Sequence, residues 1–242
     1  MKRHGMLCKW EELPEFMRTK EVFPYYKALK SHFIGLFIKR IFDFFISTIL
    51  LFLLVPVFLI VALWIKLDTK GPIFYTQKRV TQYGRIFWIY KFRTMAENAD
   101  QTGSLVTVGQ DPRITRAGRW LRKYRLDELP QLMNIWKGEM SFVGTRPEVV
   151  RYVKQYTKEM YATLLMPAGV TSRASIVFKD EDRLLEKGMR ETKEKTSPDE
   201  IYVQKILPEK MKYNLDALKE FCFLEELGLM CGTIKKVLGK EG

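Results

Sequence analysis

The sequence predicts an α+β protein that is mostly helical, with a membrane helix, a small β-hairpin and amphipathic helices at the membrane interface. Three observations carry this prediction. The run Phe44–Ile65 contains no charged residue, and at about 20 residues it is long enough to cross ~30 Å of hydrocarbon. Two short strand-like runs follow it, and apolar residues then recur at helical spacing.

Composition limits the chemistry that the chain can perform. Its 242 residues carry 41 basic and 28 acidic side chains, a formal net charge of +13, which indicates an anionic partner such as nucleic acid, a phosphorylated substrate or a membrane surface. Cys8, Cys222 and Cys231 are too widely spaced for a disulfide framework or a zinc site. His4 and His32 both precede the hydrophobic run. Carboxylates, arginines and lysines must therefore carry any chemistry in the main domain.

The hydrophobic run allows two interpretations. Its length favours an ordinary spanning helix. Pro56 lies in its middle, where proline removes a backbone hydrogen bond and bends a helix. Both flanks are also basic, whereas a spanning helix usually has basic excess on one side. These flanking residues are Lys27, Lys30, Lys39 and Arg40, then Lys66, Lys70, Lys78 and Arg79. Taken alone, the residues leave a spanning and a re-entrant helix open.

The segments around this run have simpler signals. Residues 1–36 are aromatic and of mixed charge, and we expect one or two helices over the main domain or at the interface. After the run, Ile73–Gln77 and Arg85–Tyr90 are predicted strands, joined by a hairpin at Thr81–Gly84. Residues 96–110 are polar and predict a surface loop.

A helix rich in arginine is predicted to begin at Asp111-Pro112. Its arginines recur every three residues, so they line one broad stripe, which is either solvated or faces lipid phosphates. They are Arg113, Arg116, Arg119 and Arg122.

An acidic pair follows directly. Asp127 and Glu128 stand at the start of a short amphipathic helix that should end at Gly138. The simpler interpretation is a helix cap with an acidic first turn. The neighbouring arginines favour a second one, a site for anionic oxygens and a metal ion.

The remaining sequence predicts one more phosphate contact. Glycines and prolines in 138–148 indicate a tight connection that fixes Arg146, which suits a bidentate phosphate contact, although a solvated loop arginine has the same pattern. Residues 148–166 predict a helix, 174–178 a short strand, and 179–199 a charged surface helix and loop. Beyond Pro208 the chain is amphipathic again, suited to packing on the core or to the bilayer interface.

Taken together, these residues resemble the bacterial sugar transferase family, the monotopic phosphoglycosyl transferases. Several ordered motifs over roughly residues 37–178 carry the resemblance. They are Lys39-Arg40-Ile41-Phe42-Asp43, Gly71-Pro72-Ile73-Phe74, Tyr90-Lys91-Phe92-Arg93-Thr94-Met95, Leu126-Asp127-Glu128-Leu129-Pro130-Gln131-Leu132 and Lys137-Gly138-Glu139-Met140-Ser141-Phe142-Val143-Gly144.

The resemblance implies a reaction. Such enzymes move a sugar-1-phosphate from a nucleotide sugar, usually a UDP-sugar, to polyprenyl (undecaprenyl) phosphate, and release UMP. The family's nucleophilic aspartate matches Asp127, which would form a phosphosugar intermediate, and the partner acid matches Glu128. Both would help to hold Mg²⁺. Charge that builds on the phosphoryl oxygens needs cations, and the predicted substrate-binding residues are Lys91, Arg93, Arg113, Arg125, Arg146 and Pro147.

The resemblance also implies a place in the cell and an organisation. It favours a re-entrant helix bent at Pro56, in an enzyme that is monotopic in the inner membrane, with its catalytic domain on the cytoplasmic face. The expected partners are nucleotide sugar, polyprenyl phosphate and membrane lipid, with no nucleic acid, and a homo-oligomer is compatible with the sequence. The expected parts are an interfacial or capping segment (1–36), the re-entrant helix (37–66), the catalytic domain (67–204) and C-terminal amphipathic helices (205–242).

Three departures from the family pattern bear on substrate choice. Val55-Pro56 replaces serine-proline at the bend, Thr145-Arg146-Pro147 replaces proline-arginine-proline, and residues 166–172 differ from the usual run. The sugar therefore stays open. Two other functions also stay open: a basic binder tethered by one spanning helix, and an inactive family member that serves as a scaffold. The intact acidic pair argues against both.

Overall fold

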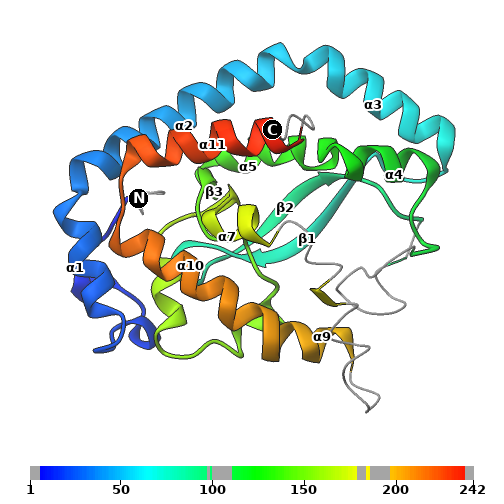
Figure 1. Ribbon diagram of the computed structural model, residues 1–242. Coiled ribbons are helices and arrows are strands. Elements are labelled where there is room, and N and C mark those ends of the chain that lie inside the picture. Colours follow the sequence, from blue (N-terminus) through cyan, green and yellow to red (C-terminus); the bar gives the residue numbers. More distant parts are fainter. Residues whose placement is uncertain (1–5, 97–98, 100–110, 179–183, 186–196, 238–242) are drawn as a thin grey trace.

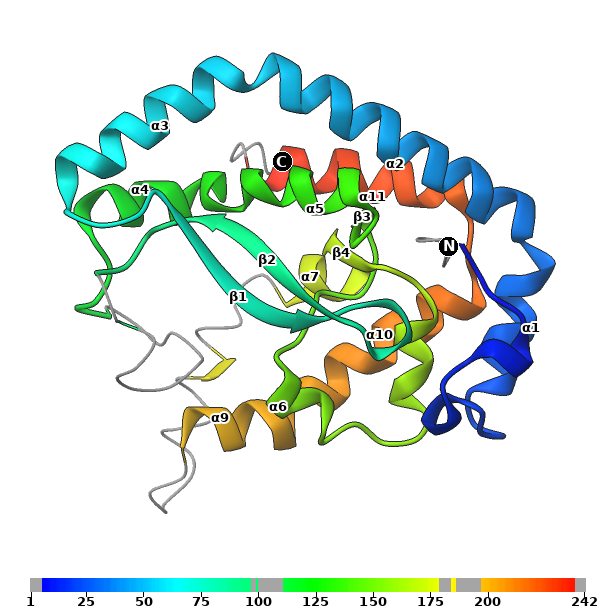
Figure 2. The same cartoon turned by 180° about the vertical axis from the view of Figure 1, so that it is seen from behind.

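A computed structural model of the protein describes residues 6–96, 99, 111–178, 184–185 and 197–237. It confirms an α+β architecture that is mostly helical, with two small two-stranded sheets in the middle (Figure 1). A long bent helix pair lies along one side, and the helices α4, α5 and α11 lie in a row beneath it (Figures 1 and 2). The predicted loop at 96–110 and most of the charged stretch at 179–199 fall outside the described residues.

The N-terminal segment packs on the domain. Two short 3₁₀ helices, Trp10–Glu12 and Glu15–Met17, precede α1 (Phe23–Ser31). Met17 and Leu29 are fully buried, in a cluster that also contains residues of the C-terminal helix α10. Apolar side chains of the N-terminal segment thus pack against α10.

The bent pair, called here the arc, consists of α2 (Phe33–Leu53) and α3 (Val55–Asp68), inclined by 60°. Pro56 lies in the first turn of α3, where its missing N–H is tolerated, and the break itself falls at Leu54. No single described helix is both long and apolar enough to cross a membrane, whereas the two arc helices together satisfy that test of length and composition.

Polar side chains attach the arc to the domain. Lys39 donates to the carbonyl of Val143 (2.9 Å), and the carboxylate of Asp43 accepts from the backbone N–H of Phe142 (3.2 Å). At the other end, Val61 and Ile65 of α3 are buried against the domain. The outer side of the arc is apolar and exposed, at Ile34, Phe45, Phe52, Leu59, Leu63 and Leu67.

The hairpin forms as predicted, with longer strands. β1 (Phe74–Val80) pairs antiparallel with β2 (Ile86–Phe92) around a 3₁₀ turn at Gln82–Gly84. The helix α4 (Arg116–Lys123), by contrast, begins later than predicted, because Thr115 caps it by accepting the N–H of Gly118. Arg113 therefore precedes the helix and does not share the stripe of the other three arginines.

The structure contains a second sheet that the sequence does not predict. β3 (Met140–Val143) and β4 (Ala168–Thr171) pair in parallel. Gly144 and Gly169 bring the two backbones into contact: a Cβ on Gly169 would lie 2.1 Å from the nitrogen of Gly144. Any side chain at position 169 would force the segments apart.

Two other predictions were wrong. The helix expected over 148–166 is divided into α6 (Val150–Val153) and a 3₁₀ helix, Met160–Leu165. The strand expected at 174–178 is the helix α7 (Arg173–Val177), because Ser172 caps it by accepting the N–H of Ser175.

The C-terminal part is helical, as predicted. It comprises α9 (Pro198–Ile201), a π-helical turn (Tyr202–Ile206), α10 (Leu207–Lys219) and α11 (Phe223–Val237). α10 packs on the N-terminal segment, and α11 lies beside α2 (Figure 1).

Candidate active site

The acidic pair lies on a tight turn rather than at a simple helix cap. The chain leaves α4 through Arg125, which has a left-handed backbone (φ 51°), and enters the 3₁₀ helix η4 (Leu126–Gln131). η4 leads into α5 (Leu132–Lys137), which ends at Gly138 as predicted, with φ 80°. Asp127 and Glu128 thus occupy the first turn of η4, and both are buried.

Three cations surround Glu128. Its Oε1 accepts from the ammonium of Lys91 (3.0 Å) and from the guanidinium of Arg146 (2.6 Å). Arg125 lies 3.8 Å from Oε2. Three of the predicted substrate-binding residues therefore converge on one carboxylate, from β2, the turn before η4 and the segment after β3.

These cations decide the charge state of Glu128. Burial alone would raise the pKa of this carboxyl, but Arg146 and Lys91 outweigh it and hold the pKa well below its ordinary value. Glu128 is therefore ionised at neutral pH, and its charge holds the three basic side chains at the site.

Asp127 is in a different state. Among the described residues, none forms a hydrogen bond or an ion pair with its carboxylate. Burial raises its pKa, partly offset by the charge of Lys91 and reinforced by that of Glu128. A buried carboxylate without donors is more basic and less solvated than a surface one, so its oxygens are available to an incoming group.

Other residues hold this arrangement and were not singled out from the sequence. Asn134 is fully buried; its Oδ1 accepts from the N–H of Tyr90 (3.0 Å), and its Nδ2 donates to the carbonyl of Trp88 (2.8 Å). It thereby fixes β2, and with it Lys91, against α5. No spacing in the sequence indicated this role, because Asn134 lies off the apolar face that Leu129, Leu132, Met133 and Trp136 predict.

Arg79 has a comparable role on the other side of the site. Its guanidinium donates to the carbonyl of Pro147 (3.1 Å) and to the side chain of Gln77. Pro147 is itself buried. Arg79 thus fixes the backbone beside Arg146, and no spacing in the sequence indicated this contact.

Two predicted substrate-binding residues donate elsewhere. Arg93 is buried and donates to the carbonyls of Lys70 and Thr69, both at 2.8 Å, so it ties β2 to the end of the arc. Arg113 forms a bidentate pair with Asp111, with distances of 2.9 and 2.6 Å. The structure brings neither guanidinium to Glu128.

The two carboxylates suit a magnesium ion that also binds substrate phosphates. The described residues contain no group of three or more side chains of the kind that would enclose a metal ion. Mg²⁺, however, is commonly bound by one or two carboxylates together with substrate phosphates. In the part of the chain that the structure describes, no residue bonds to the oxygens of Asp127, and Arg125, at 3.8 Å, is the cation paired with Oε2 of Glu128. Asp127 and Glu128 would hold the ion.

A mostly helical domain with an apolar arc and an Asp-Glu pair among cations matches the class that the sequence resembles. The chain belongs to the bacterial sugar transferase family, whose model matches residues 34–240.

Several of the relatives are named as undecaprenyl-phosphate sugar phosphotransferases. The chain is 41% identical over 145 residues (58% of this chain, 34% of the relative) to the UDP-N-acetylgalactosamine-undecaprenyl-phosphate N-acetylgalactosaminephosphotransferase of Aeromonas hydrophila. It is 47% identical over 157 residues (59% and 30%) to the undecaprenyl-phosphate glucose phosphotransferase of Komagataeibacter xylinus. The chain thus spans about a third of the length of these two relatives. It is 30% identical over 207 residues (85% and 89%) to the uncharacterized sugar transferase EpsL of Bacillus subtilis (strain 168).

Proposed function

We propose that this protein transfers a sugar-1-phosphate from a UDP-sugar to undecaprenyl phosphate, releases UMP, and thereby performs the first membrane step of a surface glycan. The names of the relatives in Aeromonas and Komagataeibacter support the lipid acceptor. The observation that carries the proposal is the buried Asp127 carboxylate, which accepts no hydrogen bond from any described residue, beside a cation-bound Glu128.

The proposed reaction has two displacements at one phosphorus. An Asp127 oxygen attacks the β-phosphorus of the donor, and the bond from that phosphorus to the oxygen shared with the α-phosphate breaks. UMP leaves with this oxygen and its electron pair. A phosphate oxygen of undecaprenyl phosphate then attacks the same phosphorus, breaks its bond to Asp127 and restores the free carboxylate.

The residues of the site suit both steps. The raised pKa of Asp127 makes it a better nucleophile than a surface aspartate, yet it stays a weak enough base to leave again. Lys91, Arg125 and Arg146 lie where negative charge would build on the phosphoryl oxygens. Mg²⁺ held by Asp127 and Glu128 would add positive charge at the diphosphate. Glu128 keeps the three cations in place.

The arc supports a membrane location for this chemistry. Its outer side is apolar, while both its ends pack on the same domain. We therefore propose that the arc enters and leaves one leaflet, the cytoplasmic leaflet of the inner membrane, as a monotopic anchor. Undecaprenyl phosphate in that leaflet would present its phosphate at the level of the domain.

The test uses the full chain in detergent or nanodiscs with Mg²⁺, undecaprenyl phosphate and a panel of UDP-sugars. We expect UMP release with at least one donor and, without acceptor, a phosphosugar adduct on the peptide that contains Asp127, detected by mass spectrometry. Asp127→Asn should lose both, whereas the surface variant Asp216→Asn should retain both. Turnover by Asp127→Asn, or an adduct on another residue, would contradict the proposal, and chelation of Mg²⁺ should lower release strongly.

A further inference from the structure

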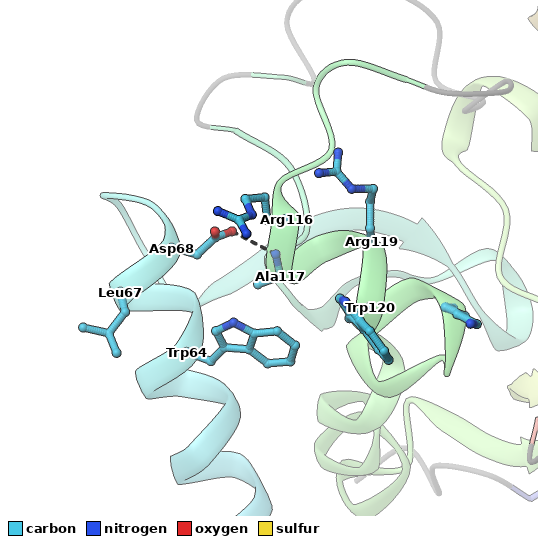
Figure 3. A pocket seen from close by; sticks show the side chains of 8 residues that line it. Trp64, Leu67, Asp68, Arg116, Ala117, Arg119 and Trp120 are labelled. Carbon is cyan, nitrogen blue, oxygen red and sulfur yellow. Dashed lines mark hydrogen bonds between the residues drawn. The ribbon is translucent and has the colours of Figure 1, made fainter.

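We infer that the protein has a second lipid site, a pocket between α3 and α4 that binds the phosphate group of an anionic membrane phospholipid. The pocket has a volume of about 540 Å³. It is lined by Trp64 and Asp68 of α3 and by Arg116, Arg119, Trp120 and Lys123 of α4 (Figure 3). The inference rests on the membrane placement proposed above for the arc.

The charge of the pocket suits a phosphate. Three cations line it, against one carboxylate, and that carboxylate is already engaged: Asp68 accepts the N–H of Ala117 at 3.0 Å, in the first turn of α4 (Figure 3). In the described part of the chain, neither Arg116 nor Arg119 forms an ion pair or donates a side-chain hydrogen bond. Guanidinium groups without a protein partner can make the paired contacts that phosphate oxygens accept.

The remaining cation is positioned by aromatic rings. The ammonium of Lys123 lies 5.6 Å from the centroid of the Trp120 ring and 5.4 Å from that of Tyr124. These two rings stack on each other, with centroids 5.7 Å apart. Lys123 is thus held near the pocket although its side chain is exposed.

The apolar side chains that line the pocket indicate where it lies relative to the bilayer surface. Trp64 is 40% exposed and Leu67 78%, both at the end of α3, whose outer side is apolar, and Trp120 of α4 is 55% exposed. Tryptophan prefers the boundary between hydrocarbon and headgroups, and arginine and lysine extend from there toward phosphates. With α3 in the leaflet, the pocket opens at the headgroup level.

The pocket is separate from the proposed reaction site. Neither Asp127, Glu128 nor any cation bound to Glu128 lines it. A phosphate held there is therefore not the phosphate that reacts, which favours a bilayer phospholipid over the acceptor. Bound lipid would hold α4 against α3, and α4 leads directly into Arg125 and η4. The site would thus stabilise the turn that carries the carboxylates.

The test measures binding to the full chain in nonionic detergent by calorimetry. The probe is short-chain phosphatidylglycerol, with short-chain phosphatidylcholine, inorganic phosphate and farnesyl phosphate as comparison arms. The combined variant Arg116→Gln, Arg119→Gln, Lys123→Gln should bind phosphatidylglycerol at least tenfold more weakly than the wild type. All three side chains are exposed, so folding should persist, and the single variant Arg119→Glu provides a second measurement.

A control of equal charge change separates this site from general charge attraction. Lys154 directly follows α6, Lys158 lies in the segment after it, and Lys205 lies in the π-helical turn after α9; all three are exposed. The helices α6 and α9 lie on the side away from the arc (Figure 2). The combined change of these lysines to glutamine should alter the affinity less than twofold.

Equal losses in both triple variants, or equal binding of phosphatidylcholine, would overturn the inference. Tighter binding of inorganic phosphate than of phosphatidylglycerol would also overturn it. The same holds if farnesyl phosphate binds more tightly and displaces phosphatidylglycerol. Failure of this binding test leaves UMP release unaffected, so it is distinguishable from failure of the proposed function.

Discussion

Two adjacent carboxylates at positions 127 and 128 have opposite pKa shifts, because one is buried with no donor among the described residues and the other is buried among cations. The sequence predicted that both acids belong to one site, since the arginines around them are close along the chain. It did not distinguish Lys91, Arg125 and Arg146, which reach Glu128, from Arg93 and Arg113, which do not. Which basic side chains reach Glu128 depends on where β2 and the segment after β3 lie in the folded chain.

The raised pKa of Asp127 has a consequence for stability. The native state binds this proton more readily than the unfolded chain does, so the free energy of unfolding falls as pH rises through the raised pKa. We therefore expect Asp127→Asn to melt higher than the wild type at pH 7, with the gap narrowing as pH is lowered. Each kcal/mol gained corresponds to about 2–4 °C for a chain of this size. Thermal melting in detergent over a pH series measures this difference in melting temperature. An Asp127→Asn variant that melts lower than the wild type at every pH would contradict the prediction.

Glu128 should behave in the opposite way. Its lowered pKa adds stability above the pKa of the unfolded chain, and this stability is lost as pH falls. Glu128→Gln leaves three cations without their carboxylate, and we expect a loss of about 1–3 kcal/mol at pH 7, reduced because these cations are partly exposed. Denaturant unfolding measures this loss. Glu209→Gln, at an exposed pair with Lys212, should change stability by less than about 0.5 kcal/mol.

At the level of elements, the contiguous hairpin was predicted and the pairing of distant strands was not. The hairpin was predicted because its strands and its turn are contiguous. The pairing of β3 with β4 was missed, because each strand has four residues and Met140 pairs with Ala168 from far along the chain. The strand expected at 174–178 failed for another reason: its β-branched residues favoured a strand, but the Ser172 cap favours a helix.

The glycine contact between these strands can be tested. In Gly169→Ala, the new Cβ would lie 2.1 Å from the nitrogen and 2.3 Å from the oxygen of Gly144, so the backbones must separate. We expect a loss of about 1–3 kcal/mol, as for other overpacked sites. Gly228→Ala is the matched control, because its Cβ would meet nothing within 4 Å on α11; there, the better helix propensity of alanine should leave stability unchanged or raise it by up to ~1 kcal/mol. Equal effects in the two variants would contradict this account of the contact.

For the whole molecule, the arc determines the topology. α2 and α3 are both attached to one domain, so we expect the residues just before and just after the arc to lie on the same side of the membrane. Ser31 and Lys70 are exposed at these positions. In a variant with serine at positions 8, 222 and 231, a cysteine at either position should react with an impermeant maleimide only when the cytoplasmic side is opened. Labelling of the two cysteines from opposite sides would instead indicate a spanning helix.

The sequence predicted the length of the arc, and the resemblance to the family favoured its bend, but neither indicated its attachment to the domain. Lys39 and Asp43 make contacts with β3, a strand that the sequence analysis did not predict. The bend also falls at Leu54, two residues before Pro56, because the proline is accommodated in the first turn of the second helix.

An anchor that enters and leaves one leaflet has a mechanical effect that a spanning helix lacks. The arc would add its volume to the cytoplasmic leaflet alone, so that leaflet would expand relative to the opposite one. Such asymmetric insertion favours curved bilayers, as for amphipathic helices that bind in the interface. The protein should therefore collect on small, highly curved vesicles in preference to large flat ones of the same lipid.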